Sequence, residues 1–161
     1  GAKLASAKKS PNRLLYATPE LRNPVHISGT ARMKIRLAAS KPAANLSIWL
    51  VSLPWDPGAR RNINANLITR GWADPQNHKK SLRESAPLEP GKFYELSFDL
   101  QPDDQIIPAG QKIGLMIFSS DREFTLWPEP GTELMVDLDA TSLDLPVVGG
   151  ANAFRKATGG R

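Results

Sequence analysis

The chain of 161 residues contains no cysteine, which excludes disulfide bonds and thiolate metal sites. It contains only two histidines, His26 and His78, so few residues are available as a catalytic base or a zinc ligand. No apolar run approaches the roughly 18 residues of a membrane-spanning helix. The first residues also lack the apolar stretch of a signal peptide. The composition predicts a soluble protein without a membrane span, and it leaves the compartment open between cytoplasmic and secreted.

Long helical repeats are missing too, because 14 prolines and 12 glycines interrupt the chain. What remains between them is a series of short segments in which apolar and polar residues alternate, as in strands with one buried face. Strands are expected over residues 14–16, 25–27, 32–37, 46–53, 64–72, 93–100, 113–118 and 133–138.

Seven or eight short strands without a crossover helix are typical of an antiparallel β-sandwich. A closed barrel is an alternative, whereas a propeller is disfavoured because the chain has no internal repeat. The long connections over residues 54–64 and 74–90 favour a jelly roll over a simple meander. We therefore expect an all-β jelly-roll β-sandwich with little helix. Its domain should cover residues 13–148, between flexible tails over residues 1–12 and 149–161.

Two of these strands differ in character. In residues 93–100, Tyr94, Leu96 and Phe98 alternate with polar residues, which predicts one dry and one wet face at the edge of a sheet. Residues 113–118 contain no polar side chain, so both faces of that strand should be covered.

The formal charge of +5 suggests a nucleic-acid ligand, but the distribution of the cations argues against one. Without six cations near the two ends, 15 basic residues stand against 16 acidic ones, so the body of the domain is almost neutral. We expect no nucleic-acid partner. The six terminal cations are Lys3, Lys8, Lys9, Arg155, Lys156 and Arg161.

Nothing in the sequence predicts a catalytic centre. The chain lacks the Gly-x-Ser-x-Gly turn that exposes the nucleophile of α/β-hydrolases. His26 follows Pro24-Val25 at the start of an expected strand and His78 stands in a polar loop, so both are interpreted as surface residues. The pair Asp103-Asp104 fits a turn after Pro102 and lacks calcium-loop spacing. We assign no catalytic, cofactor-binding or metal-binding residue, and leave a structural calcium ion open.

Four tryptophans raise the question of a binding surface, namely Trp49, Trp55, Trp72 and Trp127. Trp49 lies in an apolar strand and is expected in the core, while Trp55 and Trp127 each adjoin a proline and are interpreted as turn residues. Trp72 is less easily explained by local packing, and Arg70 precedes it by two positions. Arg70, Gly71 and Trp72 are therefore the candidate interface.

A series of short motifs resembles the C-terminal jelly-roll domain of the Xaa-Pro dipeptidyl-peptidase family, a serine peptidase group that also contains cocaine esterase and α-amino-acid ester hydrolases. Their order and spacing carry the resemblance over residues 13–148. The motifs are Ile68-Thr69-Arg70-Gly71, Ser81-Leu82-Arg83, Pro90-Gly91-Lys92-Phe93-Tyr94, Phe98-Asp99-Leu100, Pro108-Ala109-Gly110-Gln111-Lys112-Ile113-Gly114-Leu115 and Ser119-Ser120-Asp121.

The resemblance implies a galactose-binding-domain-like sandwich that is not itself catalytic. It implies that the domain packs on and stabilises a preceding α/β-hydrolase domain, which releases Xaa-Pro dipeptides from peptide N-termini. The alternatives are an independent carbohydrate-binding module, motivated by the tryptophans, and a protein-interaction module. The oligomeric state and the substrate preference of the longer enzyme stay open.

Overall fold

The computed structural model describes residues 1–56, 66–79 and 85–160. The beginning of the strand expected over 64–72 and the motif Ser81-Leu82-Arg83 lie outside the described residues. The elements follow in the order α1 (Ala2–Ser6), β1 (Leu14–Ala17), β2 (Val25–Gly29), β3 (Arg32–Ala39), β4 (Leu46–Leu53), β5 (Leu67–Ala73), the 3-10 helix η3 (Pro75–Asn77), β6 (Phe93–Asp99), β7 (Asp103–Ile107), β8 (Lys112–Phe118), β9 (Leu134–Asp144) and α2 (Gly150–Thr158).

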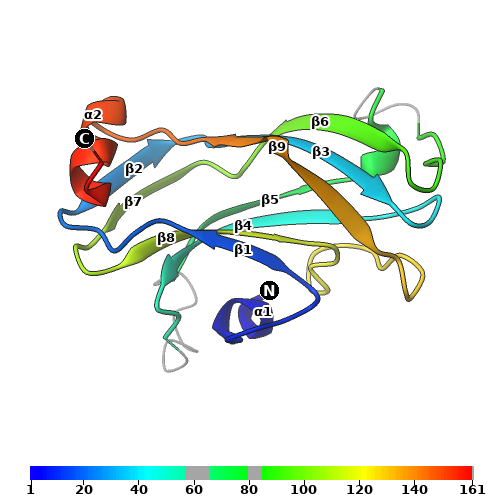
Figure 1. Cartoon of the computed structure of the whole chain (residues 1–161), viewed down its shortest axis with the longest axis horizontal. Helices are drawn as coiled ribbons and strands as arrows, with labels where there is room; N and C mark the ends of the chain where they lie inside the picture. Colours follow the sequence, from blue (N-terminus) through cyan, green and yellow to red (C-terminus); the bar gives the residue numbers. More distant parts are fainter. Residues whose placement is uncertain (57–65, 80–84, 161) are drawn as a thin grey trace.

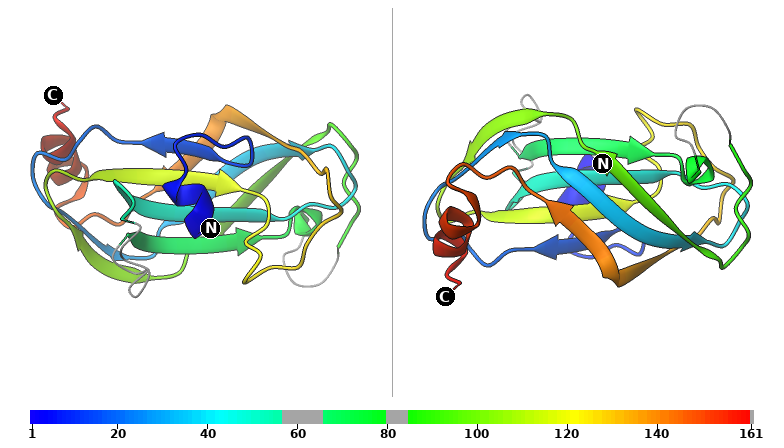
Figure 2. Two further views of the ribbon diagram at one scale, coloured as in Figure 1. Left: turned by 90° about the horizontal axis from the view of Figure 1, so that it is seen from below. Right: turned by 90° about the horizontal axis from the view of Figure 1, so that it is seen from above.

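The strands pair in a nested, antiparallel order. β1 pairs with β8, β2 with β7, β3 with β6, and β4 with β5. This nesting is the connectivity of a jelly roll, in which a long double strand wraps into two layers. Further pairing of β4 with β8 and of β3 with β9 gives the sheets β1-β8-β4-β5 and β6-β3-β9, beside the two-stranded sheet β2-β7. The two larger sheets face each other (Figures 1 and 2), so the expected β-sandwich is confirmed.

The core between the sheets follows the alternation in the sequence. Met33, Ile35 and Leu37 of β3 are 0% exposed, while Arg32 and Lys34, which alternate with them, face solvent. Burial of each such aliphatic side chain contributes about 1.5–3 kcal/mol to the free energy of unfolding. The rest of this cluster consists of Ala31, Leu46, Ile48, Leu96, Leu100 and Ile117.

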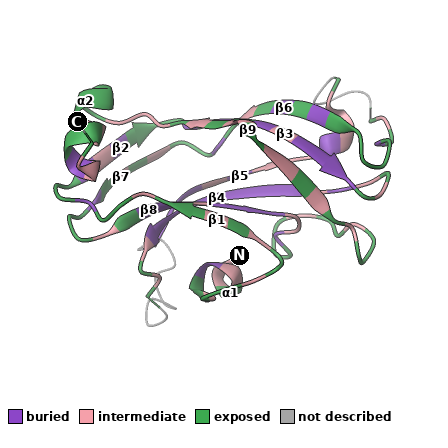
Figure 3. Cartoon of the chain, viewed as in Figure 1, coloured by how far each residue is buried: buried purple, intermediate pink, exposed green. Residues whose placement is uncertain are grey.

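β4 and β8 are buried on both faces, as the apolar run 113–118 predicts. Ile117 of β8 packs between the sheets, whereas Met116 and Phe118 pack on the outer side of their sheet. α1 crosses this outer side (Figure 2, left) and buries Ala5 there. Figure 3 shows β4 buried along almost its whole length. The middle of the four-stranded sheet is therefore dry on both faces, whereas Leu14 and Tyr16 of its edge strand β1 are 39% and 42% exposed.

The turn expected at Asp103-Asp104 is wrong, since these residues begin strand β7. Asp103 pairs with Gly29 and Asp104 with Ser28 of β2. Backbone pairing with a partner strand satisfies the donors and acceptors of these residues and outweighs their local preference for turns. Pro102, which has no N–H, stands just outside the ladder.

Alternation in β9 holds only at its beginning. Leu134 and Val136 pack against the core, but Leu138, expected on the same face, is 51% exposed. The pairing register shifts opposite Lys34 and Arg36, and such a bulge breaks the period of two.

Short helices occupy both ends, where composition predicts flexible tails. α1 buries Ala5 on the outer side of the four-stranded sheet, and α2 buries Ala157 against Leu21 and Val25. Leu4 and Phe154 pack beside these alanines, and composition does not reveal such contacts. The domain boundaries expected at residues 13 and 148 stay predictions. Among the described residues, no helix has the length and apolar character that crossing a membrane requires.

Candidate interaction surface

The three candidate residues of β5 do not share a face. Arg70 pairs with Trp49 and Trp72 with Ser47, so both side chains lie on the outer side of the four-stranded sheet. Gly71 faces the core, where an added Cβ would lie 2.6 Å from Leu100 Cδ2 and 3.1 Å from Leu100 Cα. Glycine at position 71 thus allows the two layers to approach closely, and Arg70 and Trp72 remain as surface residues.

Arg70 and Trp72 belong to a stack with Phe124, which comes from the loop between β8 and β9. The rings of Trp72 and Phe124 stack with centroids 5.5 Å apart. The Arg70 guanidinium lies 3.9 Å from the Phe124 centroid and 5.2 Å from that of Trp72. Cation–π contacts of this kind hold the long arginine side chain over the aromatic surface.

The buried side chain of Asp121 links this loop to the four-stranded sheet. It is 1% exposed, and its Oδ2 accepts hydrogen bonds from Trp49 Nε1 at 2.8 Å and Trp72 Nε1 at 3.3 Å. The Asp121 carbonyl accepts from the backbone N–H of Phe124 at 2.8 Å. One buried carboxylate thereby connects β4, β5 and the loop. Sequence reasoning missed Asp121 and Phe124, and the only signal was the motif Ser119-Ser120-Asp121 after a buried strand.

The same loop carries large apolar side chains into solvent. Leu126 is 90% exposed, Trp127 65% and Phe124 49%. The Arg122 guanidinium lies 4.8 Å from a ring centroid of Trp127, whose Nε1 donates to the Arg122 carbonyl at 3.3 Å. Trp127 is thus a surface residue and not only the corner residue expected from its neighbouring proline.

We name these side chains the aromatic–arginine patch. Within the described ranges, neither Arg70 nor Arg122 forms an ion pair. Exposed aromatic rings and arginines are the side chains enriched where proteins bind one another. The patch consists of Arg70, Trp72, Arg122, Phe124, Leu126 and Trp127.

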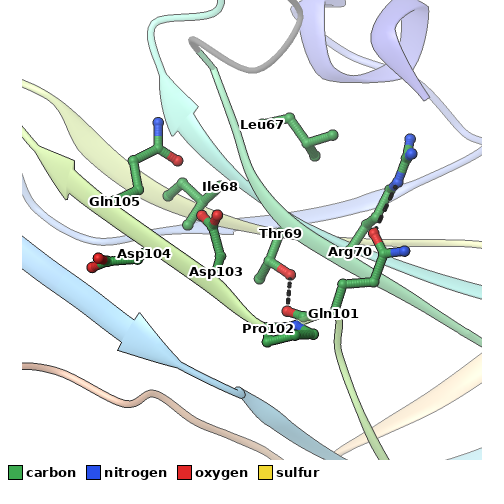
Figure 4. Close-up of a pocket in the computed structure, with 9 residues that line it drawn as sticks. All are labelled: Leu67, Ile68, Thr69, Arg70, Gln101, Pro102, Asp103, Asp104 and Gln105. Carbon is green, nitrogen blue, oxygen red and sulfur yellow. Dashed lines mark hydrogen bonds between the residues drawn. The ribbon is translucent and has the colours of Figure 1, made fainter.

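Arg70 also borders a pocket of about 320 Å³ between β5 and β7 (Figure 4). Gln101 forms part of the wall, because its carbonyl accepts from Thr69 Oγ1 at 2.5 Å and its Oε1 from Arg70 Nε at 3.4 Å. Figure 4 shows the Asp104 carboxylate directed away from that of Asp103, as expected for neighbours in a strand. In the part of the chain that the structure describes, no three His, Cys, Asp or Glu side chains gather where a metal ion could bind.

Among the residues that the structure describes, neither histidine has a nucleophile as a partner. His26 Nε2 lies 2.5 Å from Asp104 Oδ1. This contact with the imidazole, followed by smaller effects that include a hydrogen bond from Ser28, holds the pKa of Asp104 below its ordinary value. A catalytic triad needs the histidine between serine and acid, whereas here the carboxylate stands between Ser28 and His26.

His78 is held by structural contacts. Its ring lies 4.3 Å from that of Tyr94, and its Nδ1 contacts the Pro75 carbonyl at 3.2 Å. It borders a second pocket of about 480 Å³, beside Trp72 and Glu95. Across the described residues, neither histidine makes a hydrogen bond to a serine hydroxyl.

The family comparison covers almost the whole chain. The sequence profile of the X-Pro dipeptidyl-peptidase C-terminal non-catalytic domain matches residues 1–157. This chain belongs to that family. The match includes α1 and nearly all of α2, so this non-catalytic domain family extends beyond the residues 13–148 that carry the motifs.

Two relatives are longer proteins. A Rhodopirellula baltica protein, provisionally named an Xaa-Pro dipeptidyl-peptidase, is 62% identical over 150 residues, which are 93% of this chain and 24% of that protein. The Xaa-Pro dipeptidyl-peptidase of Lactobacillus delbrueckii subsp. lactis is 28% identical over 162 residues, with 81% of this chain and 20% of the relative covered. The chain thus spans a quarter or less of the length of these family members.

Solved structures share the fold of this family member at low sequence identity. An α-amino acid ester hydrolase matches with a TM-score of 0.68 and 16% identity, over 86% of this chain and 26% of the hydrolase. An aminopeptidase from a marine sediment archaeon, Thaumarchaeota archaeon, matches with a TM-score of 0.69 and 16% identity, over 87% of this chain and 26% of the aminopeptidase. The non-catalytic domain is therefore a jelly roll of the kind present in these larger proteins.

Proposed function

We propose that this chain packs on and stabilises a preceding α/β-hydrolase domain that releases Xaa-Pro dipeptides from peptide N-termini. The observation that carries this proposal is the match of residues 1–157 to the family's non-catalytic C-terminal domain. The geometry of His26 and His78 supports a division of labour, since neither stands as a general base beside a nucleophile of residues 1–56, 66–79 and 85–160. Arg70 and Trp72 are the proposed contact residues of β5.

The first experiment tests the division of labour. The chain alone should not hydrolyse a Gly-Pro or Ala-Pro p-nitroanilide and should not react with a fluorophosphonate probe for activated serines. Turnover that persists through repeated purification, together with probe labelling of this chain, would show that it is catalytic and contradict the proposal.

The second experiment tests the stabilising role. In the Rhodopirellula baltica relative, the matched 150 residues are replaced by this chain or removed. The hybrid should cleave Ala-Pro p-nitroanilide and unfold in a single thermal transition close to that of the relative. The shortened protein should unfold at lower temperature, because its contact surface is uncovered. Equal transition temperatures for the hybrid and the shortened protein would rule out stabilisation.

A second candidate function is carbohydrate binding, which the 65% exposure of Trp127 favours. A sugar ring would stack on an exposed indole face, although the Arg122 guanidinium already lies 4.8 Å from a ring centroid of Trp127. Screening of the chain on a glycan array tests this function. Binding that Trp127→Ala abolishes would support it, and absence of binding would remove it.

A further inference from the structure

The loop between β8 and β9 presents an apolar surface that nothing in the described chain covers. Leu126 exposes 90% of its surface and Trp127 65%, and Phe124 and Trp72 continue the patch back to the sheet. The patch adjoins the buried outer cluster of the sheet, since Arg70 lies 6.0 Å from a ring centroid of Trp49 in that cluster. A continuous exposed apolar surface of this kind marks a contact site.

This surface is held in place before any partner binds. Asp121 ties the loop to the indoles of Trp49 and Trp72. Asn45 Nδ2 donates to the carbonyl of Leu126, next to the most exposed side chain. A surface fixed in this way loses little conformational entropy on association, which favours binding.

The charge of the patch limits the chemistry of its partner. Arg70 and Arg122 each lie over an aromatic ring and form no ion pair within residues 1–56, 66–79 and 85–160. Arg70 Nε donates to Gln101 Oε1 at 3.4 Å, and a guanidinium held over an aromatic ring has further N–H groups that can pair with a carboxylate at the rim of the contact. The complementary surface therefore combines apolar side chains with carboxylates.

A second copy of this chain supplies few carboxylates to the patch. In a two-fold symmetric contact the patch meets itself, and beside its two arginines the loop offers Glu123, the exposed neighbour of Arg122. The preceding domain is better placed. The Gly1 nitrogen lies 3.5 Å from Asp121 Oδ1, so a polypeptide joined to Gly1 would emerge beside the patch.

We propose that the aromatic–arginine patch is the docking surface for an acidic, partly apolar surface of the preceding α/β-hydrolase domain. This inference rests on the proposed function and adds the face of the jelly roll and the chemistry of its partner. Leu126 and Trp127 enter the contact as apolar anchors, and Arg70 and Arg122 pair with carboxylates around them.

Hydrogen–deuterium exchange compares the isolated chain with the hybrid in which it replaces the matched residues of the Rhodopirellula baltica relative. Exchange in residues 122–127 should slow by about tenfold or more in the hybrid, because docking suppresses local opening. Residues 150–158 of α2, at the other end of the sandwich from this loop (Figure 1), should exchange equally in both proteins.

The outcomes separate the two proposals. Protection over residues 122–127 supports the docking surface. Protection of another face, without these residues, overturns the surface assignment and leaves the proposed function standing. If no segment is protected and the hybrid is no more stable than the shortened relative, both proposals fail.

Substitutions refine this test. Leu126→Asp in the hybrid should remove the protection of residues 122–127 and lower the thermal midpoint of the hybrid, yet leave the midpoint of the isolated chain unchanged, because this side chain is already in solvent. Ile106→Asp is the matched control, since Ile106 is 61% exposed on β7 outside the patch. Equal effects of the two substitutions on the hybrid would overturn the assignment of this surface.

Discussion

The outer face of the β6-β3-β9 sheet carries mainly charged side chains, with Phe93 and Met135 exposed among them, whereas the outer face of the β1-β8-β4-β5 sheet carries mainly apolar and aromatic ones. On the first, Arg32 lies 3.7 Å from Asp99 across the strands, and Arg36 contacts Asp137. On the second, Met116 is 0% exposed and Trp49 2%. The two sheets share a core, so the difference arises only on their outward sides.

A charged outer face is stable in water without a cover, although its ion pairs contribute little to the free energy of unfolding. An apolar outer face must be covered. Within the described residues, the cover is the five-residue helix α1 and the loop anchored by Asp121. A helix of this length is not stable alone and depends on its contacts. The difference supports the proposed docking surface on the side of the four-stranded sheet.

Truncation of one side chain on each outer face provides the strongest test of this comparison. Met116→Ala should lower the free energy of unfolding by about 2–5 kcal/mol, because it leaves a cavity in a closed cluster. Lys34→Ala, on the charged face, should change it by less than about 0.5 kcal/mol. Urea denaturation of the isolated chain measures both. Similar small effects would mean that α1 and the loop do not close the outer cluster in solution.

The buried carboxylate that holds the cover should give the next largest effect. Asp121→Ala removes the acceptor of two indole N–H groups, one from Trp49, and should lower the free energy of unfolding by about 2–3 kcal/mol. Trp49 fluorescence should shift to the red as water reaches the ring. Asp121→Asn retains an acceptor oxygen of the same shape and should lose less. Equal losses for Asp121→Ala and Asp121→Asn would indicate that the negative charge, and not the hydrogen-bond acceptor, holds the loop.

The sequence predicted those strands whose buried and exposed residues follow a pattern among neighbours along the chain. The alternation around Met33, Ile35 and Leu37 placed these residues in the core, and the unbroken apolar run 113–118 indicated a strand covered on both faces. Turn residues and connection lengths were sufficient for the jelly-roll sandwich. These features depend on a period of two, which a short window contains.

Other features depend on contacts between distant residues. Asp121 accepts from Trp49, 72 positions earlier, and no local pattern connects the two. The strand at Asp103 forms because β2 lies beside it. Gly71 was grouped with Arg70 and Trp72 because the three are adjacent in sequence, and only the register of β5 shows that it faces the core. Phe124, Leu126 and Trp127 lie in a loop, and a loop has no residue period from which their exposure could be predicted.

The smallest expected effect concerns a pair outside both outer clusters, His26 and Asp104 on the sheet β2-β7. The pKa of Asp104 is lowered mainly by the hydrogen bond with His26, so the folded state favours the ionised carboxyl. Its contribution to stability is complete above the ordinary aspartate pKa of about 4 and disappears as the pH falls through the lowered folded value.

Asp104→Asn should therefore shift the urea midpoint slightly downward at about pH 5, and the difference from the unmodified chain should vanish toward about pH 2. Asp139→Asn, which removes an equal charge from an exposed position, is the matched control for the loss of one charge. A gap that widens on acidification would contradict the assigned direction of the pKa shift. Such a gap would mean that the ionised Asp104 carboxyl destabilises the folded chain beside His26.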